Sequence, residues 1–242
     1  MSTRFSVSNE QEYADGLAAA RQALSAQRCI VLPTDTVYGI GADAFSAQGV
    51  AMLLAAKGRS RTMPPPVLIS QVATMDGLAR DVPDDARKLA EAFWPGALTL
   101  ILQAQPSLTW DLGETRGTVG LRVPNDQTAL DLLAVTGPLA VSSANRTGNP
   151  AATTADEAMD QLGESVDVYL DGGSRGADGE EVLPSTIVDA TGETLRVVRA
   201  GAISIAELRV VVPQILDLGQ EPDAGAAASE PQPGQDATGQ DA

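Results

Sequence analysis

The stretch that decides the fold is Cys29–Ala44, CIVLPTDTVYGIGADA, in which four apolar residues run into a polar segment. The apolar run Cys29–Leu32 has the length and continuity of a strand buried on both faces, and a proline ends it. We expect a loop from that proline to the end of the stretch, with Thr34, Asp35 and Thr36 projecting from the end of a sheet. Turn formation alone accounts for these residue types equally well.

Gly39–Ala44, within the same stretch, matches the dinucleotide fingerprint GxGxxA. In a dinucleotide-binding fold that turn leaves the strand directly and opens the helix that faces the pyrophosphate. Here six residues separate the apolar strand from Gly39, so the spacing disfavours a nicotinamide or flavin site.

Short apolar strands alternate with amphipathic helices around this stretch, and strands cluster late in the chain. This order predicts a single α/β domain around a mixed, twisted sheet. The predicted helices are Gln11–Gln27, Ser46–Lys57 with Ser46 as its cap, Pro83–Phe93, Gln127–Ala134, Ala155–Leu162 and a short one from Ser204. The predicted strands are Cys29–Leu32, Val67–Ile69, Leu98–Leu102, Thr118–Arg122, Leu139–Ser142, Val166–Leu170, Thr186–Asp189 and Leu195–Arg199.

The composition excludes several reaction classes. The chain has no histidine, which removes Ser-His-Asp and Cys-His hydrolysis and any imidazole ligand. Its single cysteine, Cys29, excludes an internal disulfide framework and multi-cysteine metal sites. A net charge of −16 means that a polyanion must meet a local basic cleft. No apolar run approaches the ~20 residues of a membrane span and the N-terminus lacks an apolar signal core, so we expect a cytoplasmic protein.

The last stretch differs from the rest in composition. Residues 217–242 hold six acidic residues and no Lys or Arg, and are otherwise rich in Gly, Pro, Ala, Gln and Ser. So little apolar surface cannot offset the chain entropy lost on folding. The sequence therefore predicts a folded domain over residues 1–216 and a disordered acidic tail over residues 217–242.

Further loops place polar side chains at the ends of apolar elements. Lys57, Arg59 and Arg61 occupy alternate positions after a helix and would face one ligand if the chain were extended. The favourable interaction of cations with the C-terminal end of a helix dipole explains the positions of these three residues equally well. A predicted strand ends in Arg122, whose guanidinium suits bidentate binding of a carboxylate or phosphate. The remaining polar loops are Val141–Pro150, Pro184–Asp189 and Arg199–Gly201.

Seven stretches of the chain together resemble the YrdC/YciO family, whose best-known members are L-threonylcarbamoyladenylate synthases. In chain order they are PTDTVYGIGADA, KGR followed by prolines, WPGALTLIL, GLRVP, SSANRTGNP, PSTIVD and RAGAIS, from about Cys29 to Ser204. The resemblance implies one YrdC-like domain of the short type, with a strongly twisted mixed sheet flanked by helices around a concave groove.

The resemblance also implies a reaction, in which L-threonine, bicarbonate or CO2, and ATP give threonylcarbamoyl-AMP and pyrophosphate. Partner proteins would then pass the activated group to the adenosine next to the anticodon of tRNA, and a direct contact with tRNA is a further expectation. Mg2+ is expected on the ATP phosphates, with no metal ligand from the protein. The implied roles are catalysis for Lys57 and Arg59, L-threonine binding for Thr36, Arg122 and Ser185, and ATP binding for Lys57, Arg59, Thr118, Ser143, Asn145 and Arg199.

The chain departs from the family pattern after KGR. The family usually has Pro there, then Asn or Lys before Pro-Leu, and soon a His, whereas this chain reads Ser60–Pro66 and has Leu68 near the histidine position. Arg61 is our candidate to replace part of that polar contact. The alternative function is a YciO-like paralogue that binds RNA or nucleotide without synthase activity. The single cysteine disfavours a hydrogenase-maturation domain, and the acidic balance disfavours a plain RNA-binding module.

Overall fold

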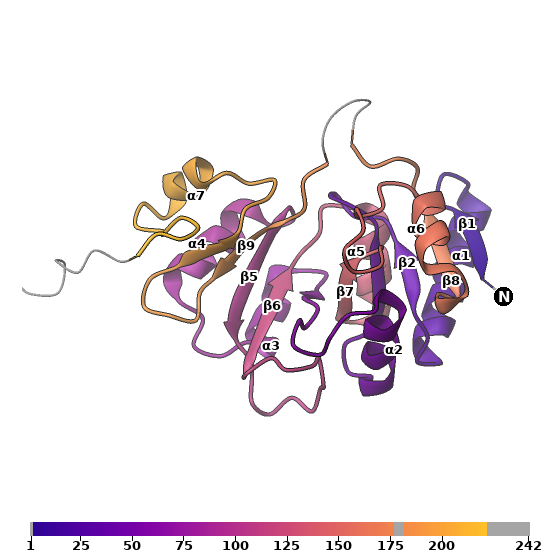
Figure 1. The fold of residues 1–242 in the computed structure, drawn as a ribbon, viewed down its shortest axis with the longest axis horizontal. Coiled ribbons are helices and arrows are strands. Elements are labelled where there is room, and N and C mark those ends of the chain that lie inside the picture. Colours follow the sequence, from indigo (N-terminus) through magenta and orange to yellow (C-terminus); the bar gives the residue numbers. More distant parts are fainter. Residues whose placement is uncertain (1, 177–181, 222–242) are drawn as a thin grey trace, which may run out of the picture.

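Ten strands form one mixed sheet in the order β1-β8-β2-β3-β7-β4-β6-β5-β9-β10. The computed structural model describes residues 2–176 and 182–221 (Figure 1). Four neighbouring pairs are parallel and five are antiparallel, which confirms the mixed sheet. The strands are β1 Thr3–Ser6, β2 Ile30–Leu32, β3 Gly39–Asp43, β4 Val67–Leu68, β5 Leu98–Gln103, β6 Thr118–Arg122, β7 Leu139–Ser143, β8 Val168–Asp171, β9 Thr186–Asp189 and β10 Arg196–Arg199.

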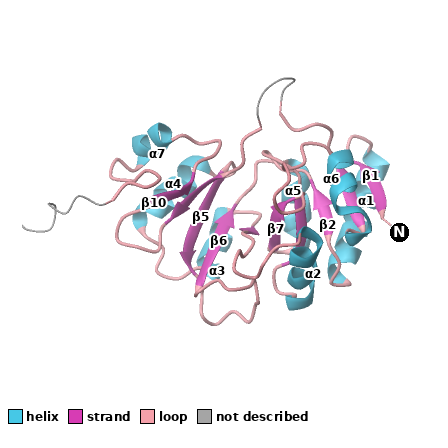
Figure 2. Ribbon diagram, viewed as in Figure 1, coloured by secondary structure: helices cyan, strands magenta, loops and turns pink. Residues whose placement is uncertain are grey.

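Helices flank this sheet (Figure 2). Side-chain oxygens cap five of the described helices, from Asn9, Ser46, Asp126, Thr154 and Ser204. Ser46 accepts a backbone N–H of α2 as predicted, and Ser204 forms a capping box with Glu207 of α7. The helices are α1 Glu10–Ser25, α2 Ala47–Lys57, α3 Met75–Leu78, α4 Asp84–Phe93, α5 Gln127–Thr136, α6 Ala155–Leu162 and α7 Ile205–Val211, with 3-10 turns at Val72–Thr74 and Gly163–Ser165. No described helix is both long and apolar enough to cross a membrane.

The alternation along β2 separates two buried apolar clusters. Ile30 and Leu32 pack with α1 and α5, whereas Val31 belongs to the larger cluster that includes residues of α2, α4 and α6. Because residues alternate between the faces of a sheet, one short apolar strand serves both cores. This is why the strand after Gln27 is apolar at every position.

The segment Gly39–Asp43, predicted as loop, is the strand β3. It pairs antiparallel with β2 and β7, so residues 33–38 form the turn of a hairpin. A Cβ at Gly39 would lie 2.6 Å from Cγ1 of Val141, and one at Gly41 would lie 3.4 Å from both Val141 and Leu32. The two glycines therefore make room for these side chains, and the absence of a strand-to-helix turn removes the dinucleotide fingerprint.

The other predicted elements occur within a few residues of their expected bounds. β1 was missed because Thr3–Ser6 has no apolar alternation and is half-exposed; its pairing with β8 orders it. α3 was missed because its four residues are too few to show a helical period.

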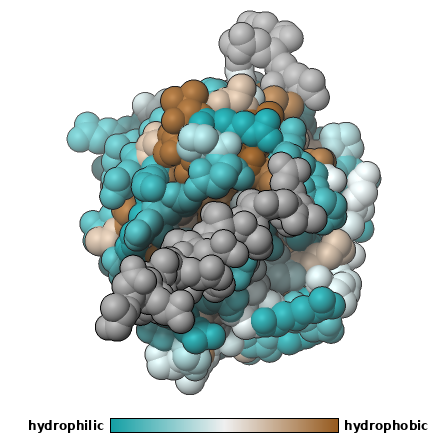
Figure 3. Space-filling model, turned by 90° about the vertical axis from the view of Figure 1, so that its left-hand side faces the viewer, coloured by the Kyte–Doolittle hydropathy of each residue, from teal (hydrophilic) through white to brown (hydrophobic). Residues whose placement is uncertain are grey.

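The described chain continues a few residues past the predicted domain boundary. Leu216 bridges to Arg196, and the main-chain and side-chain oxygens of Gln220 accept hydrogen bonds from Arg196 and Arg209. Residues 222–242 of the predicted tail lie outside the described residues. Hydrophobic and hydrophilic residues mix on the α7 end of the molecule, where Val210 is exposed (Figure 3).

We predict that Gly39→Ala lowers the free energy of unfolding by about 1–3 kcal/mol, the usual cost of overpacking. The added methyl would collide with Val141, whose branched side chain has little rotamer freedom. Urea unfolding measures the change. Gly77→Ala is the control, because a Cβ there meets nothing within 4 Å. Val141→Ala should recover part of the loss, and a Gly39→Ala protein of unchanged stability would contradict the packing argument.

Candidate active site

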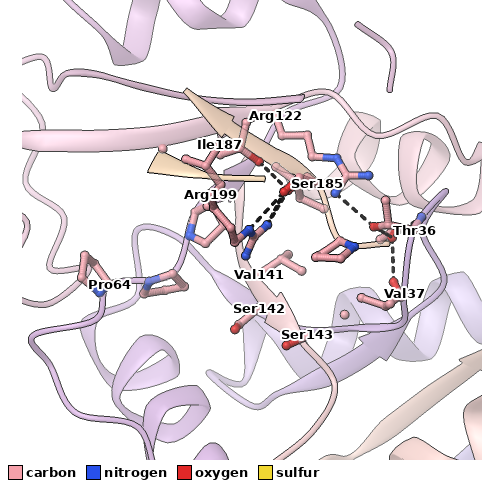
Figure 4. Close-up of a pocket in the computed structure, with 18 of the residues that line it drawn as sticks. Thr36, Val37, Pro64, Arg122, Val141, Ser142, Ser143, Ser185, Ile187 and Arg199 are labelled. Atoms are coloured by element: carbon pink, nitrogen blue, oxygen red, sulfur yellow. Dashed lines mark hydrogen bonds between the residues drawn. The ribbon is translucent and has the colours of Figure 1, made fainter. Parts of the chain in front are cut away.

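A cavity of about 430 Å3 gathers most of the predicted site residues (Figure 4). Its lining comes from the β2–β3 turn, the loop after α2, strands β5, β6 and β7, and the chain around β9 and β10. Segments far apart in sequence therefore meet in one hollow. The predicted residues that line it are Thr36, Arg59, Thr118, Arg122, Ser143, Asn145, Ser185 and Arg199.

Three guanidinium groups give the cavity a positive charge. Arg59, Arg122 and Arg199 line it, and the described lining contains no aspartate or glutamate. Burial lowers the pKa of Arg199, and the nearby charges of Arg122 and Arg59 lower it further. Arginine stays protonated despite such shifts, so the three like charges persist. A basic cleft thus lies within a protein of net charge −16.

Arg122, 6% exposed, is fixed by three hydrogen bonds. Its Nε donates to the carbonyl oxygen of Gly96 at 2.9 Å, its Nη1 to Thr36 Oγ1 at 3.1 Å, and its Nη2 to Asp35 Oδ1 at 2.7 Å. The backbone N–H of Asn125 also donates to Asp35 Oδ1, at 2.9 Å. One N–H group on each terminal nitrogen of Arg122 remains without a partner among the described residues, which leaves donors for an anionic ligand.

The β2–β3 turn builds its own shape from threonine hydroxyls. Thr34 Oγ1 donates to the carbonyl oxygen of Val37 at 2.7 Å and accepts the backbone N–H of Thr36 at 3.2 Å. Thr34 and Thr36 are both 4% exposed, and their hydroxyls lie 3.1 Å apart. The structural and functional interpretations of this turn are therefore compatible: Thr34 folds it, and Thr36 meets Arg122 at the cavity.

Arg199 and Ser185 form a second polar cluster. Arg199 Nη2 donates to the carbonyl oxygen and the hydroxyl of Ser185 at 2.6 and 2.9 Å. The hydroxyl of Ser185 also lies 2.9 Å from that of Thr99 on β5. A side chain on Gly201 would collide with the backbone of residues 184–186, so a glycine is needed for the chain after Arg199 to approach this closely.

Lys57 is not among the residues that line the cavity, and its predicted place on the ATP phosphates stays a prediction. It is 3% exposed, and its Nζ donates to the carbonyl oxygen of Ser143 and, at 2.7 Å, to that of Asn145. The lysine therefore anchors the turn after β7. Burial, with a smaller contribution from the charge of Arg59, lowers the pKa of Lys57 to about 8.

The expectation that Lys57, Arg59 and Arg61 share one face is wrong, because the chain is not extended there. Lys57 ends α2 and Gly58 adopts φ +61°, a left-handed conformation that turns the chain. Arg59 then reaches the cavity, where its Nη1 donates to Ser142 Oγ at 2.8 Å. Arg61 pairs with Asp111 at 2.7 Å outside the lining, so it does not replace a polar contact in the cavity.

The side-chain amide of Asn145 hydrogen-bonds to the backbone of its own turn. Its Nδ2 donates to the carbonyl oxygens of Arg146 and Asn149 at 2.9 and 2.8 Å. Thr118 Oγ1 likewise donates to the carbonyl oxygen of Thr115 at 2.8 Å. Both residues line the cavity while holding backbone in place, so each shapes the site as well as facing it.

Three polar residues of the site were not among the predicted site residues, although Asp35 was expected to project from the same end of the sheet as Thr36. Ser142 and Thr99 line the cavity, and Asp35 supports Arg122. The signal for Thr99 is a lone hydroxyl within an otherwise apolar strand. For Ser142 no signal separates it from its neighbour Ser143, and both of these residues at the end of β7 line the cavity.

We predict that the wild-type protein gains stability relative to Lys57→Met as the pH rises from about 8 to 10.5. In this window the unfolded chain still holds the lysine proton that the folded chain has lost, so rising pH favours the folded state. Urea unfolding of both proteins across this range measures the difference. If the difference in unfolding free energy between the two proteins is constant or falls as the pH rises, the burial of the Lys57 charge is contradicted.

Comparison with known proteins agrees with this geometry. A protein of Mycobacterium leprae, provisionally named threonylcarbamoyl-AMP synthase, is 50% identical over 88% of this chain and 94% of its own length. The threonylcarbamoyl-AMP synthase of Bacillus subtilis is 33% identical over 81% of this chain, which spans 56% of that longer protein. The crystal structure of Pyrococcus abyssi Sua5 complexed with L-threonine superposes with a TM-score of 0.80 at 27% identity, covering 92% of this chain and 65% of that one.

The fold recurs in the crystal structure of Escherichia coli YciO, with a TM-score of 0.75 at 24% identity over 86% of this chain and all of the other. The family profile Sua5_yciO_yrdC, described as "Telomere recombination", matches residues 22–201. That range contains every residue that the sequence pattern placed in the site. The chain belongs to the Sua5/YciO/YrdC family.

Proposed function

We propose that this protein is a threonylcarbamoyl-AMP synthase, which makes threonylcarbamoyl-AMP and pyrophosphate from L-threonine, bicarbonate or CO2, and ATP. The observation that carries the proposal is the cavity of Arg59, Arg122 and Arg199, which holds three cations and no carboxylate among its described lining. Every substrate of this reaction except CO2 carries a carboxylate, carbonate or phosphate. A cavity that concentrates positive charge in an acidic protein is suited to bring such anions together.

The chemistry requires alignment of two anionic reactants. The amine of threonine adds to the carbon of CO2, or of bicarbonate with loss of water, and gives a carbamate. A carbamate oxygen then forms a bond to the α-phosphorus of ATP, while the bond from that phosphorus to the bridging oxygen breaks and pyrophosphate leaves with the electron pair. Cations that neutralise the repulsion and hold attacker and leaving group in line would supply most of the rate enhancement.

The contacts of the site support a division of roles. The donors left on Arg122, beside Thr36, suit the carboxylate of threonine, with Ser185 nearby to complete that subsite. Arg59 and Arg199 suit the phosphates and the departing pyrophosphate, and Thr118, Ser143 and Asn145 offer neutral contacts to the nucleotide. Because Lys57 bonds the backbone of Ser143 and Asn145, we assign it a positioning role.

Mg2+ is proposed only as part of the Mg–ATP substrate. The cavity lining offers hydroxyl, amide and guanidinium groups, and the described residues contain no group of three potential metal-ligating side chains of His, Cys, Asp or Glu. Mg2+ prefers carboxylate and phosphate oxygens, so this donor set does not fit a resident ion. Transfer proteins that act on tRNA, and a location in the cytoplasm where tRNA is modified, belong to the same proposal.

The direct test is pyrophosphate release that requires ATP, L-threonine and bicarbonate together, with threonylcarbamoyl-AMP identified by mass spectrometry. The proposal expects release to stop when any one substrate is omitted. A YciO-like paralogue without synthase activity would bind nucleotide or RNA and release no pyrophosphate in response to threonine, and that result would overturn the assignment.

We further predict that Arg59→Ala and Arg122→Ala each lower kcat/KM for pyrophosphate release about 100-fold or more, as for other preorganised groups that stabilise a transition state. Arg122→Ala should chiefly raise the KM for threonine, whereas Arg59→Ala should chiefly affect ATP. Arg80→Ala is the matched control, because Arg80 is half-exposed and lies outside the cavity lining. Equal losses in Arg80→Ala would show that the effects are not specific to the site.

A further inference from the structure

The long β5–β6 loop, residues 104–117, forms one wall of the cavity without belonging to any of the motifs that marked the site. Leu112 and Thr115 of this loop line the cavity. In Figure 4, Pro64 of the loop after α2 lies on the opposite side of the cavity from Thr36. The β5–β6 loop contacts that same loop after α2, to which Arg59 belongs.

Two contacts join the two loops, and a third joins the β5–β6 loop to the segment before α2. Arg61 Nη2 pairs with Asp111 Oδ1 at 2.7 Å, and the backbone N–H of Glu114 donates to the carbonyl oxygen of Arg61 at 2.8 Å. The ring of Trp110 stacks on that of Phe45, with centroids 5.5 Å apart and planes inclined by 24°. The stack ties the same loop to the residue that precedes the cap of α2.

The backbone of the β5–β6 loop is shaped for this approach. Gly113 has φ +105°, and a Cβ there would lie 2.6 Å from the carbonyl oxygen of Arg61. Its N–H donates to Asp111 Oδ1 at 3.1 Å, so the carboxylate that pairs with Arg61 also holds the loop's own turn. The ion pair, the backbone hydrogen bond and the aromatic stack all involve residues 110–114, and together they stabilise one arrangement of that segment.

We propose that Arg61, Asp111 and Trp110 are positioning residues, which hold the β5–β6 loop against the two segments that flank α2 so that Leu112 and Thr115 form the nucleotide-facing wall of the cavity. This rests on the proposed function for the identity of the nucleotide. None of the three residues lines the cavity. Their effect is therefore indirect, and it concerns ATP rather than threonine, because the joined loops include Arg59 and not the Thr36 turn.

The test compares KM values for ATP and for threonine in Arg61→Ala and Trp110→Ala. We expect the KM for ATP to rise about three- to fivefold in each, the range set by exposed ion pairs and aromatic contacts, with the KM for threonine unchanged. Trp110→Phe, which keeps a ring on Phe45, should retain most of the affinity. Raising the salt concentration should weaken ATP binding more in the wild type than in Arg61→Ala.

The control is Arg87→Ala, which breaks an ion pair of the same 2.7 Å length and similar exposure, Arg87–Asp76, outside the cavity lining. Binding of ATP alone, measured by calorimetry, separates this proposal from the proposed function because it needs no turnover. If the wild-type protein binds ATP but makes no product, the proposed function is overturned, and the positioning role can still be measured from ATP binding. Unchanged ATP affinity in Arg61→Ala and Trp110→Ala, or an equal rise in the KM for threonine, would overturn the positioning role.

Discussion

The rest of the site depends on keeping three arginines, of which Arg122 is buried, in one cavity without letting their neighbours neutralise them. Like charges that are shielded from water repel each other. Desolvation lowers the pKa of Arg199, and the charges of Arg122 and Arg59 lower it further. The protein holds the guanidinium groups mostly with neutral acceptors: Gly96 and Thr36 for Arg122, Ser142 for Arg59, and Ser185 for Arg199. Asp35 is the exception, and it leaves donors of Arg122 open. The charge is thereby fixed in place and kept available to anions.

Backbone geometry brings these side chains together. The hairpin β2–β3 presents Thr36 beside Arg122, the left-handed Gly58 directs Arg59 into the cavity, and Gly201 lets the chain after Arg199 approach Ser185. Lys57 supports this arrangement from outside the lining, through the carbonyl oxygens of the turn after β7. A buried ammonium in that role costs desolvation free energy, which is visible in its lowered pKa. Neighbouring residues of one sequence motif therefore have different roles: Arg59 faces the cavity, whereas Lys57 holds the backbone beside it.

Much of the fold could be predicted because local rules decide it. Apolar runs gave β2, β5, β6 and β7, and an N-cap serine gave the start of α2. Elements whose stability comes from their partners could not be predicted. β1 is polar and exists through pairing with β8, and β3 contains two glycines that are poor strand formers on their own. The strand conformation of β3 depends on its pairing with β2 and β7 and on Val141 and Leu32, which pack against its two glycines.

The sequence alone determined that no imidazole chemistry occurs, that any anion must meet a local basic cleft, and which polar residues end the strands that surround it. Those properties depend on composition and on local periodicity, which a linear chain displays. Only the tertiary structure decided that Arg59 enters the cavity while Lys57 and Arg61 do not, that Asp35, Thr99 and Ser142 complete the site, and that the β5–β6 loop forms one of its walls. These outcomes depend on the direction in which a turn points each side chain and on which distant segment of the chain packs across the cavity. The spacing of residues along the sequence gives neither the direction of a side chain nor its distance from such a segment.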